Sequence, residues 1–401
     1  MITRRTVCRG AALLLLCCCC LAVSGCWDRK EIESRGYVLG IAIDMAQPAP
    51  PAAAEILKTE QAAGSRKYKV SYEMKKIRSK GESAGNPGSG EDESLVYAAE
   101  GESLFATIRA VNTQYPSALF FEDNQLLVLS EAVARDGVKD LIDFFDRDPE
   151  FRRRAKVFIT PGRAEDLFMC KTKSGELIST YVPRITRNVK KTPTFATTTE
   201  VGLISEKIHN NQSIAIPRII IDGDNVKAIG AALFDRSYKM VAILNEQDTV
   251  GSKILRRRLH EGVTIVPNPR QPDKISVFEL FQAEIDVEPH LENGRLWFDL
   301  KAKFIGALAE NQVGRQKTLQ SDFLAALEQT LSEQFVHQTR HAYASLQKNR
   351  TDVVELGFLV HKKYPRYWKE IKERWDEEIF PQVPLQDVII EVTIRNTAMT
   401  L

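Results

Sequence analysis

The residues with the most definite chemistry lie near the start of the chain. Three arginines precede an apolar run over residues 11–23, and Ser24, Gly25 and Cys26 follow it. This order is typical of a secretory signal, and the run is too short to cross a bilayer comfortably. A thiol directly after two small residues can receive a diacylglyceryl group before a peptidase cuts. We therefore predict cleavage between Gly25 and Cys26, with Cys26 as the lipidated first mature residue. The alternative is an ordinary signal peptide in which Cys26 has no role.

The best candidate for a metal site is a set of three residues spaced four apart. Glu333, His337 and His341 share one face of a predicted helix, but no fourth ligand is visible. A solvated polar face is the interpretation we favour. The chain has no nucleophile elbow, P-loop, dinucleotide fingerprint or paired-cysteine zinc motif. The sequence thus predicts no catalytic residue, no metal and no cofactor.

Two groups of aspartates could in principle supply a pair of catalytic carboxylates. Asp143, Asp146 and Asp148 fit a helix end, whereas Asp222 and Asp224 fit a turn. Both groups therefore have a structural explanation that needs no chemistry.

Two runs of three arginines and two tryptophans complete the candidates. The runs 152–154 and 256–258 could meet anionic lipid headgroups or acidic loops of a membrane partner. Solvated surface or local ion pairing is the interpretation we prefer. Trp368 and Trp375, near two helical turns apart, are predicted core anchors.

Composition narrows the class of protein. Removal of residues 1–25 leaves 376 residues, which favours more than one hydrophobic core. The chain is 43% hydrophobic and 27% charged, and its acidic and basic side chains nearly balance, so nucleic acid is not an implied partner. After cleavage Cys26 is consumed by lipid and Cys170 is the single remaining thiol, so no intrachain disulfide is expected.

Helical and strand patterns alternate in the first half of the mature chain. Asp222-Gly223-Asp224-Asn225 then predicts a hairpin turn, and we expect a new sheet to begin near residue 214. A long helix over residues 319–346 carries an apolar stripe at four-residue spacing that should cover this second sheet. The predicted strands are 37–43, 67–77, 126–129, 156–160, 214–221, 226–234, 240–244, 263–266, 276–287, 295–304 and 387–394. The other predicted helices are one that begins at 101–103 and is ended by Pro116, and those over 138–145, 200–209, 352–361 and 366–378.

These patterns predict an α+β, multi-domain protein with mixed or antiparallel sheets covered by helices. The predicted division is a signal peptide over residues 1–25, an N-terminal α+β domain over 26–213 with possible subdomains, and a C-terminal α+β domain over 214–401.

Several blocks of sequence resemble one known family. Cys26-Trp27-Asp28 is followed by Gly40-Ile41-Ala42-Ile43-Asp44, then by matching blocks at 101–105, 145–152 and 230–235. The C-terminal blocks include Trp368, Trp375 and Phe380. In this order they resemble the Ger(x)C family of spore-germination receptor lipoproteins. Glu122-Asp123-Asn124 stands where members often carry a histidine.

The resemblance implies a role at a membrane. Members are extracytoplasmic α+β proteins anchored by lipid to the spore inner membrane, where they act with two integral-membrane subunits in sensing nutrients, and they are not known as enzymes. We therefore expect a non-catalytic receptor subunit. The alternatives are a solute-binding lipoprotein that captures a nutrient between its halves and, more distantly, a cell-wall hydrolase.

Overall fold

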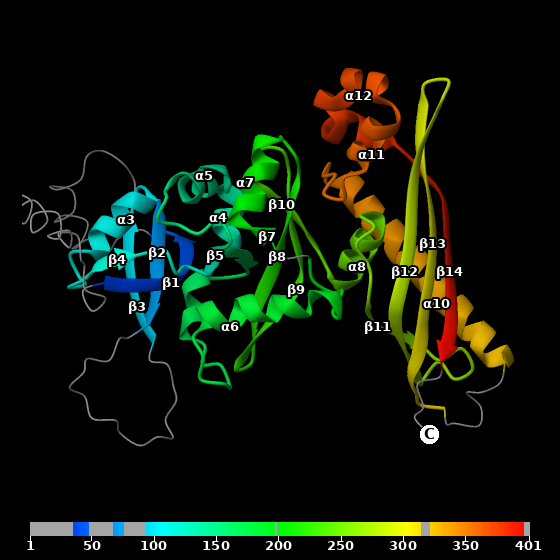
Figure 1. Ribbon diagram of the computed structural model, residues 1–401, viewed down its shortest axis with the longest axis horizontal. Helices are drawn as coiled ribbons and strands as arrows, with labels where there is room; N and C mark the ends of the chain where they lie inside the picture. The colour runs from blue at the N-terminus through cyan, green and yellow to red at the C-terminus, as the bar shows by residue number, and fades with distance from the viewer. Residues whose placement is uncertain (1–34, 48–66, 76–93, 197–198, 314–320, 397–401) are drawn as a thin grey trace, which may run out of the picture.

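The computed structural model describes residues 35–47, 67–75, 94–196, 199–313 and 321–396 (Figure 1). The predicted signal, Gly25 and Cys26 lie outside these ranges. Two parts stand side by side, each built on its own sheet, and the α+β class predicted from the sequence is confirmed (Figure 1). No helix within the described ranges combines the length and apolar character needed to span a bilayer.

The first part is built on a ten-stranded mixed sheet, counted over the described residues. Along the main path the order is β10-β9-β8-β6-β5-β1-β2-β3, while β4 pairs with β1 and β7 with β6. The central strands β1, β5, β6 and β8 run parallel, and the outer strands are antiparallel. The strands are β1 (Arg35–Met45), β2 (Tyr68–Lys75), β3 (Ser94–Gly101), β4 (Ala118–Phe120), β5 (Leu126–Ser130), β6 (Lys156–Thr160), β7 (Thr199–Glu200), β8 (Ile214–Asp222), β9 (Asn225–Phe234) and β10 (Met240–Leu244).

The central strands are largely apolar because both faces of the sheet are covered. Side chains alternate between faces along a strand. In β5, Leu127 and Leu129 face one core and Leu126 and Val128 face another. Helices α4, α5 and α7 cover the first face, and α6 with η2 covers the second. The helical elements of this part are α3 (Leu104–Val111), α4 (Glu131–Asp136), α5 (Lys139–Arg147), η2 (Ala164–Met169), α6 (Ile178–Ile185), η3 (Thr186–Lys190) and α7 (Val201–His209).

The expectation that a new sheet begins near residue 214 is wrong. β8 pairs with β6 in parallel at Ile159–Arg218, and β9 and β10 continue the first sheet from there. The turn at 222–225 does form a hairpin, as predicted. A hairpin signal is local, so it fixes the pairing of its own two strands without specifying which sheet they join. The two sheets divide between β10 and β11.

Helix α8 (Glu246–Leu255) lies where the two parts meet. Its residues Ile254 and Leu255 share one hydrophobic core with Leu233 of β9 and with the helix α10 of the second part. Gly251 of α8 is needed at the crossing, because a Cβ there would overlap the carbonyl oxygen of Gln338 in α10. The two parts are therefore joined by a continuous apolar core.

The second part is a four-stranded sheet, again counted over the described residues, with order β11-β12-β13-β14. The long hairpin of β12 and β13 is antiparallel, and β14 pairs with β13 in parallel. The predicted apolar stripe of α10 is confirmed, because Phe323, Leu327, Leu331 and Phe335 are buried in the core under this sheet. The elements are β11 (Gly262–Pro267), β12 (Ile275–Glu292), β13 (Arg295–Asn311), α10 (Ser321–Lys348), α11 (Leu356–Lys363), α12 (Pro365–Ile371), η4 (Lys372–Arg374), η5 (Trp375–Ile379), η6 (Phe380–Gln382) and β14 (Leu385–Asn396).

Helices α11 and α12 and the short helical turns after them form a small cap, which one buried carboxylate holds together. Asp352 accepts hydrogen bonds from the backbone N–H groups of Leu356 (2.9 Å) and Gly357 (2.7 Å) and from Nε1 of Trp375 (2.8 Å). Trp375 is buried against Trp368 with ring centroids 5.3 Å apart. Trp375 is thus a core anchor, as predicted, and Trp368 is half-buried beside it.

Candidate functional site

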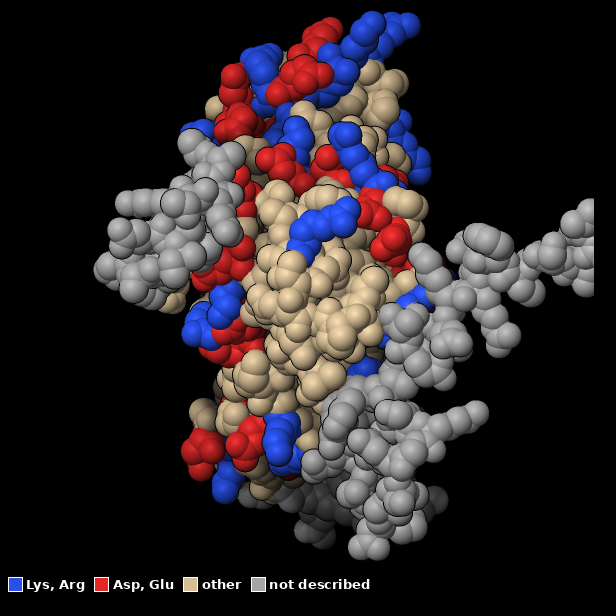
Figure 2. Space-filling view, turned by 90° about the vertical axis from the view of Figure 1, so that its left-hand side faces the viewer, with Lys and Arg blue, Asp and Glu red and all other residues tan. Residues whose placement is uncertain are grey.

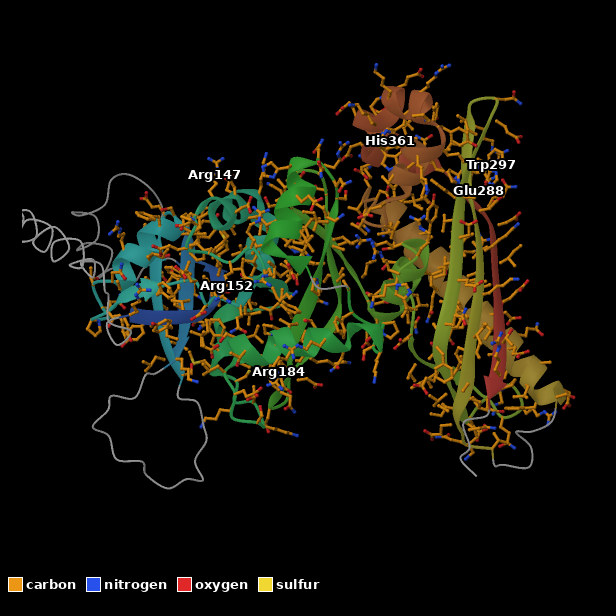
Figure 3. All side chains as sticks on the ribbon, in the orientation of Figure 1. Arg147, Arg152, Arg184, Glu288, Trp297 and His361 are labelled. Atoms are coloured by element: carbon orange, nitrogen blue, oxygen red, sulfur yellow. The ribbon has the colours of Figure 1, made fainter. Side chains whose placement is uncertain are left out.

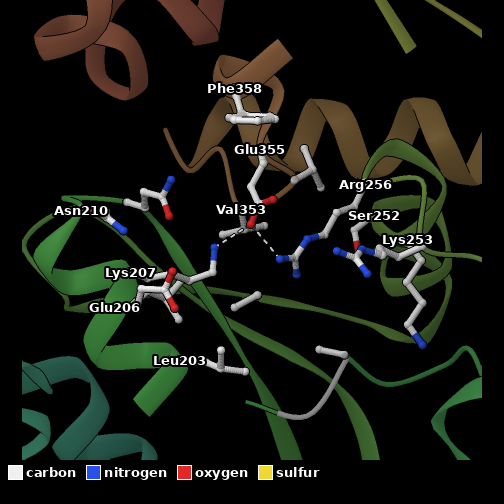
Figure 4. A pocket seen from close by; sticks show the side chains of 16 residues that line it. Leu203, Glu206, Lys207, Asn210, Ser252, Lys253, Arg256, Val353, Glu355 and Phe358 are labelled. Carbon is white, nitrogen blue, oxygen red and sulfur yellow. Dashed lines mark hydrogen bonds and ion pairs between the residues drawn. The ribbon is translucent and has the colours of Figure 1, made fainter. Parts of the chain in front are cut away.

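A cavity lined by several charged side chains lies at the junction of the two parts. It has a volume of about 520 Å³, within the range of small-molecule pockets. Helix α7 and strand β8 form one wall, α8 forms a second, and the segment between α10 and α11 forms the third (Figure 4). Four basic side chains and two acidic ones line it: Lys207, Lys253, Arg256 and Arg258 with Glu206 and Glu355.

Glu355 links the three walls of this junction cavity. Its Oε1 accepts from Nζ of Lys207 on α7 and from Nη2 of Arg256 beside α8, each at 2.7 Å (Figure 4). Burial disfavours the charge on Glu355, but the positive charges of Arg256 and Lys207 outweigh it and lower its pKa. The backbone of Glu355 is left-handed, with φ of +65°, which turns the chain into α11 directly after the carboxylate.

Lys253 is a largely buried lysine that lines the same cavity. Its side chain comes from α8 and the residue is only 6% exposed. Nζ lies 5.6 Å from the ring centroid of Phe195, a cation–π contact. Among the described residues no carboxylate balances its charge. Burial lowers the pKa of Lys253 to about 8.

A second hollow of about 430 Å³ adjoins the junction cavity on the other side of Glu355 and Phe358. Arg236, from the turn between β9 and β10, crosses it to the helical cap. Its Nε lies 3.5 Å from Oδ2 of Asp376, and Nη1 donates to the carbonyl oxygen of Glu373 at 3.0 Å. Asp376 in turn accepts from the backbone N–H of Asp352 at 3.0 Å. The cap is therefore held on the first sheet by charged contacts on both sides of Glu355.

The predicted lipid site cannot be placed, since Gly25 and Cys26 lie outside the described residues. Cys170, the other mature cysteine, is half-buried at the end of η2, and burial raises the pKa of its thiol. Nothing at Cys170 suggests chemistry.

The candidate metal set is not assembled as a site. His341 pairs with Asp248 of α8, and Glu333 accepts from the amide of Gln329 at 2.9 Å. His337 stacks on His341 with ring centroids 6.1 Å apart. Within the described ranges, no group of three metal-ligating side chains is close enough to hold an ion.

Three arginines of the two runs are engaged in ion pairs, two of them in 152–154 and one in 256–258. Arg152 pairs with Asp123 at 2.8 Å, and Arg153 pairs with Asp146 (Figure 3 marks Arg152). Arg256 is held by Glu355 in the junction cavity.

The aspartate groups have the structural roles given as the alternative. Asp143 pairs with Arg147 one helical turn away at 2.9 Å, at the solvent edge of α5 (Figure 3). Asp148 accepts from the backbone N–H of Glu150 at 3.0 Å. Asp222 closes the turn between β8 and β9.

Apart from Arg256, sequence reasoning missed the residues that make the junction. Lys253 lies in a helix that was not predicted, and no sequence pattern predicts the left-handed backbone conformation of Glu355. Asp352 had a detectable signal, because an aspartate four residues before Leu356 is typical of a helix start. That signal indicates a cap and does not reveal the long-range bond to Trp375.

Comparison with known proteins assigns the fold to a family. A family model described as the spore germination protein N-terminal domain matches residues 28–221. A second, described as spore germination B3/GerAC like, C-terminal, matches residues 229–398. The chain therefore belongs to the Ger(x)C family of spore germination proteins.

Individual relatives extend along almost the whole chain. Spore germination protein KC of Bacillus subtilis (strain 168) is 24% identical, over 94% of this chain and 93% of its own length. Spore germination protein A3 of the same organism is 25% identical, over 94% and 95%. The crystal structure of the GerBC protein superposes with a TM-score of 0.56 at 20% identity, covering 81% of this chain and 93% of that one. That likeness supports the fold.

Proposed function

We propose that this protein is the lipid-anchored, non-catalytic subunit of a spore nutrient germinant receptor, acting with two integral-membrane subunits to trigger germination. The observation that carries the proposal is the match of both family domains, in order, to proteins named for spore germination. Ser24, Gly25 and Cys26 add a lipid attachment point directly before the first domain.

Lipid attachment would confine the protein to the outer face of the spore inner membrane. Encounter with the membrane subunits then becomes two-dimensional, which raises their effective concentration without a large interface. A non-catalytic role is consistent with the junction, where Glu355 and Asp376 are occupied by cations and Asp352 by three N–H donors. These groups hold elements together and are not arranged as a nucleophile with a base.

The test is the pair Cys26→Ala and Cys170→Ala in spores. We expect Cys26→Ala to leave the fold intact but to lower membrane retention of the protein and nutrient-triggered germination. Cys170→Ala removes the other mature thiol and should leave both unchanged. Normal germination with fully released Cys26→Ala protein would refute a required anchor.

Capture of a small nutrient in the junction cavity is a second candidate function. Within the described residues, the largely buried Lys253 has no anionic partner, and Nε of Arg256 is buried with no hydrogen-bond partner. Donors left in this state favour an anionic or carbonyl-bearing solute.

Calorimetric titration of the mature chain with amino acids and sugars tests this second candidate. Saturable binding at one site, lost in Lys253→Met and kept in the exposed-site control Lys227→Met, would support solute capture. Absence of binding by every nutrient that triggers the spores would leave the receptor-subunit role and remove direct capture.

A further inference from the structure

The end of the molecule formed by α3 and β4 has an unusual surface. Residues 103–121 contain a single charged side chain, Arg109, although 27% of the whole chain is charged. Figure 2 looks onto this end and shows uncharged side chains gathered in its centre, with charged ones around them. Phe105 is 51% exposed there.

Aromatic rings and two arginines make up this surface. No lysine, aspartate or glutamate occurs between Ser103 and Phe121. The guanidinium of Arg109 lies 4.9 Å from the ring centroid of Phe105, and that of Arg35 lies 4.4 Å from the ring centroid of Phe120. We define the end surface by these residues and the rings that pack beside them: Arg35, Tyr37, Tyr97, Phe105, Arg109, Tyr115 and Phe120.

The chain enters the fold on this same surface. Strand β1 begins at Arg35, and its first residues pair in parallel with β4, Arg35 opposite Ala118 and Tyr37 opposite Phe120. Nine residue steps separate Arg35 from Cys26, which bounds the distance between their Cα atoms at roughly 30 Å. If Cys26 carries the lipid, the end surface is held close to the bilayer.

We propose that the end surface docks on the headgroup region of the bilayer, with its rings at the interface and Arg35 and Arg109 on anionic lipid phosphates. Exposed aromatic rings with a polar or cationic neighbour are the side chains favoured at membrane interfaces. Arginine also forms paired hydrogen bonds with phosphate oxygens. The proposal rests on the lipid anchor proposed above, and it adds an orientation: the first sheet stands nearest the membrane and the second part projects away from it (Figure 1).

The docking can be tested without the anchor. The mature chain, residues 26–401, is prepared with Cys26→Ser so that no lipid is attached, and its partition onto vesicles is measured by co-sedimentation. Vesicles of phosphatidylcholine with phosphatidylglycerol are compared with phosphatidylcholine alone at low salt. We expect binding to the anionic vesicles that weakens with added salt, and weaker binding to the neutral ones.

Matched double variants locate the binding surface. Phe105→Ser with Arg109→Ser should lower the partition coefficient on anionic vesicles by about fivefold for the arginine alone, and further for the ring. Ile389→Ser with Lys303→Ser likewise removes one large apolar and one cationic side chain, on the outer face of the second sheet, and should change binding less than twofold. Ile389 is 48% exposed there and the Lys303 side chain 68%. Both sites are exposed, so circular dichroism should show the folded state in each.

Depth of insertion gives an independent readout. In a Cys26→Ser, Cys170→Ser background, Phe105→Cys labelled with an environment-sensitive fluorophore should shift to the blue on anionic vesicles, and a label at Ile389→Cys should not. The proposal is overturned if the parent chain does not bind anionic vesicles, or if the Phe105 and Arg109 variant binds as the parent does. Either result would instead favour a protein partner on this surface. Failure of the anchor would appear separately, as unchanged retention of Cys26→Ala in spores.

Discussion

Replacement of Lys253 by methionine should stabilise the protein at neutral pH. The residue is 6% exposed, so its charge is little screened by water, and methionine keeps a linear apolar stem of similar length. Burial lowers the pKa of Lys253 from 10.5 to about 8. That gap corresponds to roughly 3 kcal/mol of free energy of unfolding lost while the amine is charged in both states.

The sign of the pH dependence follows from the lowered pKa. Between about pH 8 and pH 10.5 the unfolded chain holds more protons at this site than the folded chain. The contribution of this group to the free energy of unfolding therefore becomes less unfavourable as the pH rises through that window. Below about pH 8 the whole loss of stability applies. The advantage of Lys253→Met over the parent should be roughly 3 kcal/mol at pH 7 and fall to about 2 kcal/mol at pH 9.

Urea unfolding followed by tryptophan fluorescence measures this difference. Trp297, Trp368 and Trp375 lie in the part whose core includes α8, so they report on its unfolding. Lys227→Met is the matched control, because its side chain is 48% exposed and pairs with Glu246, and it should change stability by less than about 0.5 kcal/mol. An unchanged or lower stability of Lys253→Met at pH 7, or a gap that does not narrow with pH, would refute the assignment of an unpaired buried charge.

Two further substitutions test how the parts are joined. Glu355→Gln leaves Lys207 and Arg256 facing each other without a carboxylate. It should lower the free energy of unfolding by about 2 kcal/mol, a value reduced because the site is partly exposed. If the second change Lys207→Met restores the stability, repulsion between the two cations is the cause. Gly251→Ala places a methyl group against the carbonyl oxygen of Gln338 and should lower the free energy of unfolding by about 2 kcal/mol, measured by thermal or urea unfolding. An alanine at an exposed position of α8 should leave the stability unchanged. Equal effects of the two substitutions would contradict the close crossing of α8 and α10.

Local patterns predicted the elements whose burial follows a simple period. Strands β5 and β6 were found because each has a short apolar run at its centre, and α10 because its stripe keeps four-residue spacing over several turns. In contrast, α6 was missed, since Pro183 lies inside it and its sequence is weakly patterned. Helix α8 was missed because Gly251 and Thr249 are poor helix formers. Packing of the helix against α10 holds them in the helical conformation.

The site could be predicted less well than the fold. The junction depends on a lysine, an arginine and a glutamate separated by about 50 to 150 positions in the chain, and charged residues carry no signal of their partners. Where a residue's role was decided by its immediate neighbours, as with Asp143 and Asp148, the preferred explanation agreed with the structure. The lipid site at Cys26 stays a prediction.

The membership of β9 and β10 in the first sheet bears on how such proteins can be recombined. The C-terminal family model begins at residue 229, within β9, so the region assigned to one domain supplies strands to the sheet of the other. In a chimera of two family members joined near residue 225, strands from two different proteins would pair in one sheet. Their side chains would then pack into one core without having been matched to each other. Exchange at 256–261, after α8 and before β11, would instead keep each sheet's strands from one parent. The new contacts would then lie between α8 and α10 and at the junction, where Lys207 and Arg236 meet Glu355 and Asp376. Receptor specificity carried by either part should therefore transfer more faithfully across the later junction.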